Sequence, residues 1–135
     1  MRLFTSDYSK TVDIGTSSIW NSVYSTARTV LSDSISAHVP LAMAFLKTGA
    51  CSAADAKETQ VQLMEIRSAF LALAPEKAIY DWHQPAMPAP WKGNIAPTVT
   101  SCASLYTTAD GKDLLCEVSN LLEYAGQQQL DISAE

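Results

Sequence analysis

Three prolines, Pro85, Pro88 and Pro90, lie close together in the middle of the chain and restrict its fold more than any other feature. Proline lacks a backbone N–H, and it disfavours helical conformation in the residue before it. This segment can therefore be neither a helix nor the interior of a sheet, and it is predicted to be a loop. The helices and strands must be built from the sequence on either side.

The sequence on both sides of this loop favours strands. Residues 79–82 form a short apolar and aromatic run, and residues 105–108 form a second β-prone run, so each is predicted to be a strand. Asp110-Gly111 then predicts a turn that opens a helix. If that helix is a right-handed crossover, residues 105–108 pair in parallel with a short C-terminal strand at 130–132. If strands 79–82 and 105–108 are also parallel neighbours, they end at the same edge of the sheet.

Apolar residues recur at helical spacing in four segments, which predicts helices near residues 17–31, 40–48, 53–73 and 111–125. A first-turn proline and a following glycine mark the second helix, and Gly126 is expected to follow the fourth. The first helix should turn its polar residues outward: Asn21, Ser22, Ser25, Arg28 and Thr29.

A further β segment is expected before the first helix, around Leu3-Phe4 and residues 11–14. The order is then strand, three helices, strand, loop, strand, helix, strand. Segregated helices and a small sheet define the α+β class. We expect one domain over residues 1–135, with a sheet of about four strands packed by about four helices.

Composition and charge narrow the range of partners. Apolar residues make up 47% of the chain and charged residues 17%, which is typical of a globular protein. The formal charge is −5 and there is no stripe of Lys and Arg, which argues against a nucleic-acid partner. The charge is compatible with a basic protein partner, and equally with ordinary solubility.

No sequence signal directs the chain to a membrane or out of the cell. The first residues contain no apolar segment of the signal-peptide type, and no run is long enough to span a bilayer. Three cysteines, Cys51, Cys102 and Cys116, show no CxxC spacing. We therefore expect a cytoplasmic protein with reduced thiols and no membrane contact.

The sequence contains no recognisable catalytic or cofactor motif. It has two histidines, no GxSxG, no phosphate-binding glycine motif and no zinc-ligand spacing. Asp81-Trp82-His83 is the one triplet with some chemical potential, since an Asp beside a Trp can be held partly buried. A strand end carrying the same residues is common, so we expect no enzyme activity, no cofactor and no metal.

Four segments carry a resemblance to a known family: residues 14–18, residues 80–82, residues 90–95 and residues 105–114. They read Ile-Gly-Thr-Ser-Ser, Tyr-Asp-Trp, Pro-Trp-Lys-Gly-Asn-Ile and Leu-Tyr-Thr-Thr-Ala-Asp-Gly-Lys-Asp-Leu. In order and spacing they resemble the immunity-70 family of bacterial polymorphic-toxin immunity proteins. The Pro-Trp and Asp-Gly-Lys-Asp-Leu elements are the specific part, and the match covers nearly the whole chain.

The resemblance implies a protein that is encoded beside a toxin and protects its own cell by binding that toxin. A compact acidic chain with Trp residues on a proline-held loop suits a protein-binding role, because Trp, Tyr and Arg contribute much of interface energy. The candidate toxin-binding residues lie in the loop and in the Asp-Gly turn: Asp81, Trp82, His83, Trp91, Lys92, Asp110, Lys112 and Asp113. Trp82 and Trp91 could equally belong to the core.

Two other classes of function remain open from the residues alone. One is a small enzyme that uses Asp81 and His83 in a cleft against Trp91, which a substrate-sized pocket with a perturbed carboxylate would favour. The other is an accessory domain that binds a small ligand or forms a homodimer, which a large exposed apolar patch would favour. The sequence does not specify the oligomeric state.

Overall fold

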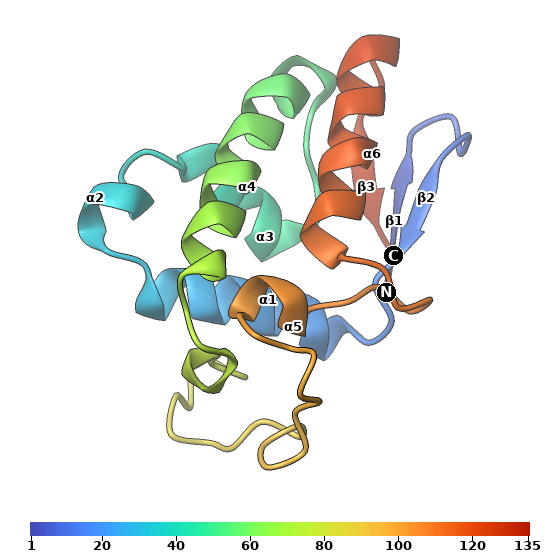
Figure 1. Cartoon of the computed structure of the whole chain (residues 1–135). Coiled ribbons are helices and arrows are strands. Elements are labelled where there is room, and N and C mark those ends of the chain that lie inside the picture. The colour runs from blue at the N-terminus through green and yellow to red at the C-terminus, as the bar shows by residue number, and fades with distance from the viewer.

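Two long helices, α4 (Ala56–Leu71) and α6 (Leu114–Gln128), lie side by side in the centre of the computed structural model, which describes residues 1–135. Helix α3 (Pro40–Thr48) packs against α4, and α1 (Ser17–Val30) packs against α3 and crosses below the pair in Figure 1. These four helices confirm the four predicted from periodicity.

Helix boundaries follow local capping chemistry. Pro40 is the first residue of α3, and Gly49 ends it with φ 75, a left-handed conformation that glycine adopts without a steric penalty. The last helix differs from the prediction at both ends. Its N-cap is Asp113 rather than the Asp-Gly turn, and it continues through Gly126 to a left-handed Gln129 with φ 56.

Short helical turns connect the main elements. They are α2 (Asp33–Ser36), η1 (Ala53–Asp55), η2 (Pro75–Lys77) and α5 (Cys102–Leu105). The Ser52 side chain accepts a hydrogen bond from the backbone N–H of Asp55, and this bond caps η1 just ahead of α4.

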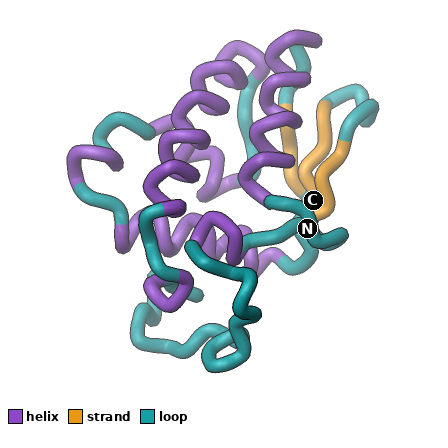
Figure 2. Tube along the Cα trace, viewed as in Figure 1, coloured by secondary structure: helices purple, strands orange, loops and turns teal.

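The sheet is small and entirely antiparallel. It contains β1 (Arg2–Thr5), β2 (Thr11–Asp13) and β3 (Ile132–Ala134) in the order β2-β1-β3. Leu3 of β1 lies opposite Val12 on one side and Ala134 on the other, so the two chain ends meet in one sheet (Figures 1 and 2). The α+β class is confirmed, with three strands rather than about four.

Two predicted strands are absent, and with them the parallel crossover. Residues 79–82 form part of a loop, because their backbone groups bond to side chains of α1 and not to a neighbouring strand. Residues 102–105 are helical, since Ser101 and Ser104 form a capping box that starts α5. Thr107 makes only an isolated bridge to Asp113, so the strand at 105–108 was a wrong prediction.

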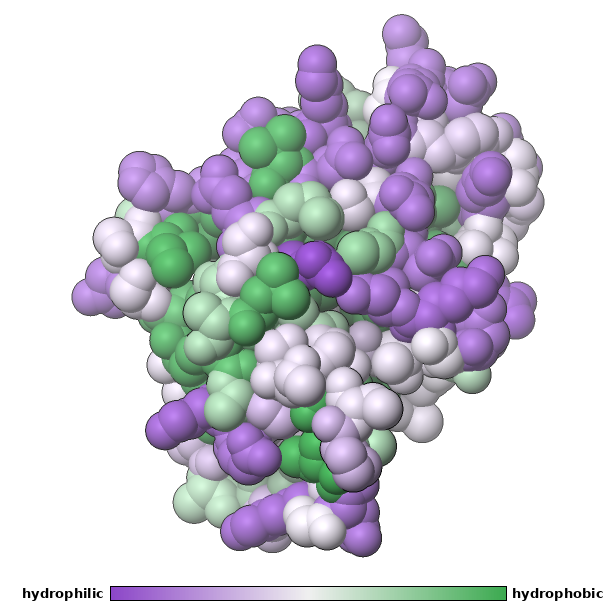
Figure 3. All heavy atoms as spheres, in the orientation of Figure 1, coloured by the Kyte–Doolittle hydropathy of each residue, from purple (hydrophilic) through white to green (hydrophobic).

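The core lies between the helices and one face of the sheet. Its largest fully buried side chains include Leu3, Phe45, Phe70 and Tyr106. On the face shown in Figure 3, hydrophilic residues cover most of the upper right, hydrophobic and near-neutral residues gather over the left and centre, and the lower part is mixed. The lower part is formed by the loop between η2 and α5, residues 78–101 (Figure 2).

Candidate functional site

Loop 78–101 has no regular secondary structure, yet buried hydroxyl groups attach it firmly to α1. The backbone N–H of Ile79 donates to Thr26 Oγ1 at 2.8 Å, and its carbonyl accepts from Ser22 Oγ at 2.8 Å. The Tyr106 hydroxyl lies 2.8 Å from the Oγ atoms of both residues. A buried polar cluster on α1 therefore holds the start of the loop in place.

This cluster corrects a prediction about α1. Ser22 and Ser25 were expected to face outward, but both are fully buried, as is Thr26. Ser25 Oγ accepts a hydrogen bond of 3.0 Å from the backbone N–H of Trp82. Helix side chains thus satisfy the backbone groups that a sheet partner would otherwise have paired.

Trp91 is held edge-on between two tyrosines. Its ring centroid is 5.8 Å from that of Tyr80 and 6.2 Å from that of Tyr106, with interplanar angles of 82° and 88°. The indole is half-buried and packs against the core. Trp91 therefore has a structural role, while part of its surface stays accessible to a partner.

A cavity of about 250 Å³ opens beside Trp91, within the proline-rich part of the loop. Its apolar lining includes Ile79, Met87 and Ile95, and Glu76 and Lys92 are its charged residues. Neither Asp81 nor His83 lines it. The enzyme hypothesis required those two side chains in a cleft against Trp91, and that arrangement is not formed.

Trp82 lies in a different group, at the C-terminal end of α1. Arg28 Cζ is 3.9 Å from the centroid of the indole ring, and the His83 ring is 3.9 Å from it at an angle of 30°. Asp81 accepts a hydrogen bond of 3.1 Å from the backbone N–H of His83, which shapes the turn. Trp82 is half-buried and His83 is exposed.

The Asp-Gly turn forms a third group beside β2. The Thr108 hydroxyl donates to the Asp110 carboxylate, and this bond, followed by the nearby Lys112 ammonium at 3.5 Å, lowers the pKa of Asp110. The backbone N–H of Ala109 donates to the carbonyl of Asp13 at 3.0 Å. The turn is thus attached to the sheet.

Asp113 links this turn to α4 and α6. Its carboxylate accepts from the backbone N–H of Cys116 at 3.0 Å and pairs with the Arg67 guanidinium at 2.8 Å. Burial alone would raise the pKa of Asp113, but the bonds from Arg67 and Cys116 outweigh it, so the pKa lies below its ordinary value. This residue has a clear structural role as an N-cap.

The eight predicted site residues therefore fall into three groups. Asp81, Trp82 and His83 lie by the end of α1, Trp91 and Lys92 lie by the cavity, and the Asp-Gly turn lies against β2. The prediction that segments 79–82 and 105–108 end at the same edge of the sheet is wrong, because neither segment is a strand. Sequence reasoning missed Arg28, because only the fold brings it to Trp82.

No helix is both long and apolar enough to cross a membrane. No group of three His, Cys, Asp or Glu side chains is placed to hold a metal ion. The three cysteines are free, and burial raises the pKa of Cys102 to about 11.

The fold and these groups define a small α+β domain whose distinctive surface features are aromatic and charged side chains on anchored loops. Residues 4–134 match the family described as Immunity protein 70, so the chain belongs to this family of immunity proteins. The match confirms the resemblance found in the sequence. Searches of curated proteins and of solved structures gave no significant match.

Proposed function

We propose that this protein binds a toxin domain encoded near it and blocks the toxin's activity, which protects the cell that makes both. The observation that supports this most is the family match, which covers residues 4–134. Binding rather than turnover agrees with the separation of Asp81 and His83 from the cavity beside Trp91.

The toxin-binding surface that we propose is loop 78–101 with the adjoining end of α1. Loops of this length without regular structure are uncommon in compact domains and are often functional. This one presents two half-buried tryptophans, and Met87 is an exposed apolar residue within it. Aromatic side chains held by a rigid support are the usual centres of interface energy. Asp110, Lys112 and Asp113 are proposed as a second contact region.

The binding hypothesis predicts stoichiometric protection. The neighbouring toxin domain is expressed from one inducible promoter and this protein from another, and cell survival is measured against the ratio of the two proteins. Survival should rise until about one molecule is present per toxin molecule and then level off. Full protection far below that ratio would indicate an enzyme that inactivates the toxin catalytically. Absence of protection at any ratio would reject the proposed function.

A further inference from the structure

Arg28, Trp82 and His83 form a stack at the C-terminal end of α1, here called the cationic stack. The guanidinium carbon and the imidazole centroid each lie 3.9 Å from the indole centroid. At that distance two planar groups on one face would overlap, so they occupy opposite faces of the indole. A cation over an aromatic face is electrostatically favoured.

The guanidinium of Arg28 is oriented but has no acidic partner. Its Nη1 donates to the Tyr24 hydroxyl at 3.1 Å, and its other N–H groups make no hydrogen bond within the chain. No carboxylate lies within ion-pairing distance of Arg28, which is exposed. The nearby Asp81 bonds instead to the backbone N–H of His83. Planar guanidinium donors match a carboxylate in geometry and charge.

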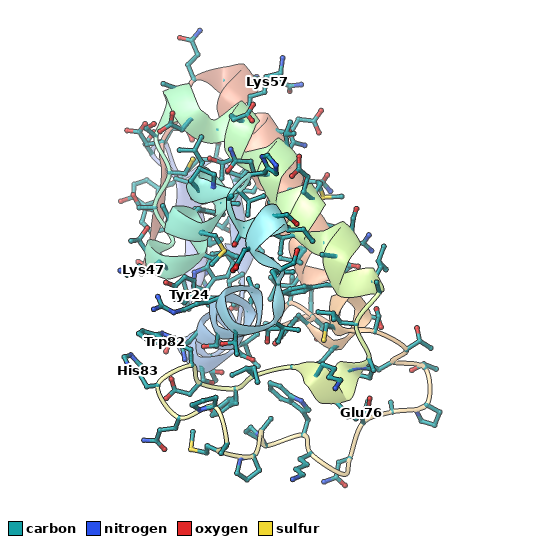
Figure 4. All side chains as sticks on the ribbon, turned by 90° about the vertical axis from the view of Figure 1, so that its left-hand side faces the viewer. Tyr24, Lys47, Lys57, Glu76, Trp82 and His83 are labelled. Carbon is teal, nitrogen blue, oxygen red and sulfur yellow. The ribbon has the colours of Figure 1, made fainter.

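Further positive charge lies on the same side of the molecule. Lys47, Tyr24, Trp82 and His83 follow one another along one edge in Figure 4, and Lys47 is exposed and forms no ion pair. The whole chain has a formal charge of −5, so the positive charge of Arg28 and Lys47 is local. It is too small for the extended basic surface that nucleic acids require. A carboxylate on a protein partner fits it better.

We propose that the cationic stack receives an Asp or Glu side chain of the toxin domain. This inference rests on the proposed function and adds the chemistry of one contact. The stack fixes the guanidinium before binding, so little side-chain entropy is lost when the carboxylate arrives. The indole edge beside it would exclude water from the ion pair and strengthen it.

The test uses Arg28→Gln, with Lys57→Gln as the matched control. Each removes one positive charge, but Lys57 lies at the far end of the molecule from Trp82 in Figure 4. The affinity of each variant for the toxin domain of the neighbouring gene is measured by calorimetry, and thermal unfolding is followed in parallel. We expect Arg28→Gln to weaken binding about tenfold to a hundredfold, as for loss of a charge-assisted hydrogen bond, and Lys57→Gln to change it little.

A charge reversal identifies the partner group. Arg28→Glu should bind still more weakly, and one Asp→Arg or Glu→Arg substitution in the toxin should restore its binding while weakening wild-type binding. If the wild type binds and Arg28→Gln binds equally well, the inference is wrong and the proposed function stands. The inference is also wrong if no reversed toxin residue rescues Arg28→Glu. If the wild type does not bind the toxin domain, both the inference and the proposed function are rejected.

Discussion

Tyr106→Phe tests the polar cluster that joins loop 78–101 to α1. Tyr106 is 1% exposed, and its hydroxyl lies 2.8 Å from the Oγ atoms of Ser22 and Thr26. Phenylalanine keeps the ring in place beside Trp91 but removes the hydroxyl. Ser22 and Thr26 keep Ile79 as a partner, so the loss should be modest. We expect a destabilisation of about 1–2 kcal/mol at pH 7.

The effect of Tyr106→Phe on the free energy of unfolding should disappear or reverse at high pH. Burial raises the pKa of Tyr106 to about 12, from the ordinary value of 10.0. The folded state therefore favours the neutral phenol, and this contribution is complete below pH 10 and is lost as the pH rises toward 12. A difference of two pKa units corresponds to about 2–3 kcal/mol that only the wild type loses. Tyr106→Phe should then equal or exceed the wild type in stability near pH 12.

Urea unfolding under reducing conditions, at intervals from pH 7 to pH 12, measures this difference. Tyr8→Phe is the control, because Tyr8 is 72% exposed and its hydroxyl makes no hydrogen bond in the chain. It should match the wild type at each pH. A gap between wild type and Tyr106→Phe that stays constant up to pH 12 would refute the claim that the fold seals this phenol from water.

Five further substitutions probe other parts of the structure. Gly49→Ala should destabilise the fold by about 2–4 kcal/mol in thermal unfolding, since φ is 75 and the new Cβ would lie 2.7 Å from a Cβ in β3. Gly93→Ala is the control: φ is 80 but the space around it is open, so it should cost about 1 kcal/mol. Asp113→Ala should cost about 1–3 kcal/mol at pH 7 through loss of the cap and ion pair. That loss should shrink as the pH falls below the ordinary carboxyl value of 3.8, because the lowered pKa stabilises the fold only while the group is ionised. Trp91→Ala should weaken toxin binding about thirtyfold while Lys112→Ala changes it little, and a Trp91→Ala protein that melts early but binds normally when folded would make Trp91 purely structural.

The helices could be predicted from the sequence because their signals are local. Pro40 and Gly49 bracket α3 where the structure places it, and the apolar period of α1 predicts its length within a residue. Gly126 misled the prediction for α6, since a glycine inside a helix differs little in sequence from one that follows it. There the helix continues and packs beside Ala56 and Lys57.

The predicted strands failed because β propensity describes a side chain that fits a half-buried surface, not a particular hydrogen-bond partner. Ile79 and Trp82 do lie on such a surface, but it is the buried hydroxyl face of α1. Periodicity assigned Ser22 and Ser25 of that face to solvent because serine is polar. Which of these hydroxyls meets a backbone group depends on contacts between distant segments, and a single sequence does not encode them in any local pattern.

The candidate surface combines loop residues that are recognisable in the sequence with partner residues that only the fold brings beside them. The aromatic residues of loop 78–101 could be recognised in the sequence, because Trp on a proline-held loop is a local feature. Their partners could not, since Arg28 belongs to a helix far away along the chain. The buried hydroxyls nevertheless determine where both groups lie, because Ser25 fixes the backbone of Trp82 within reach of Arg28. The cost of ordering this part of the loop is therefore met during folding, which leaves more of the contact energy available for binding a partner.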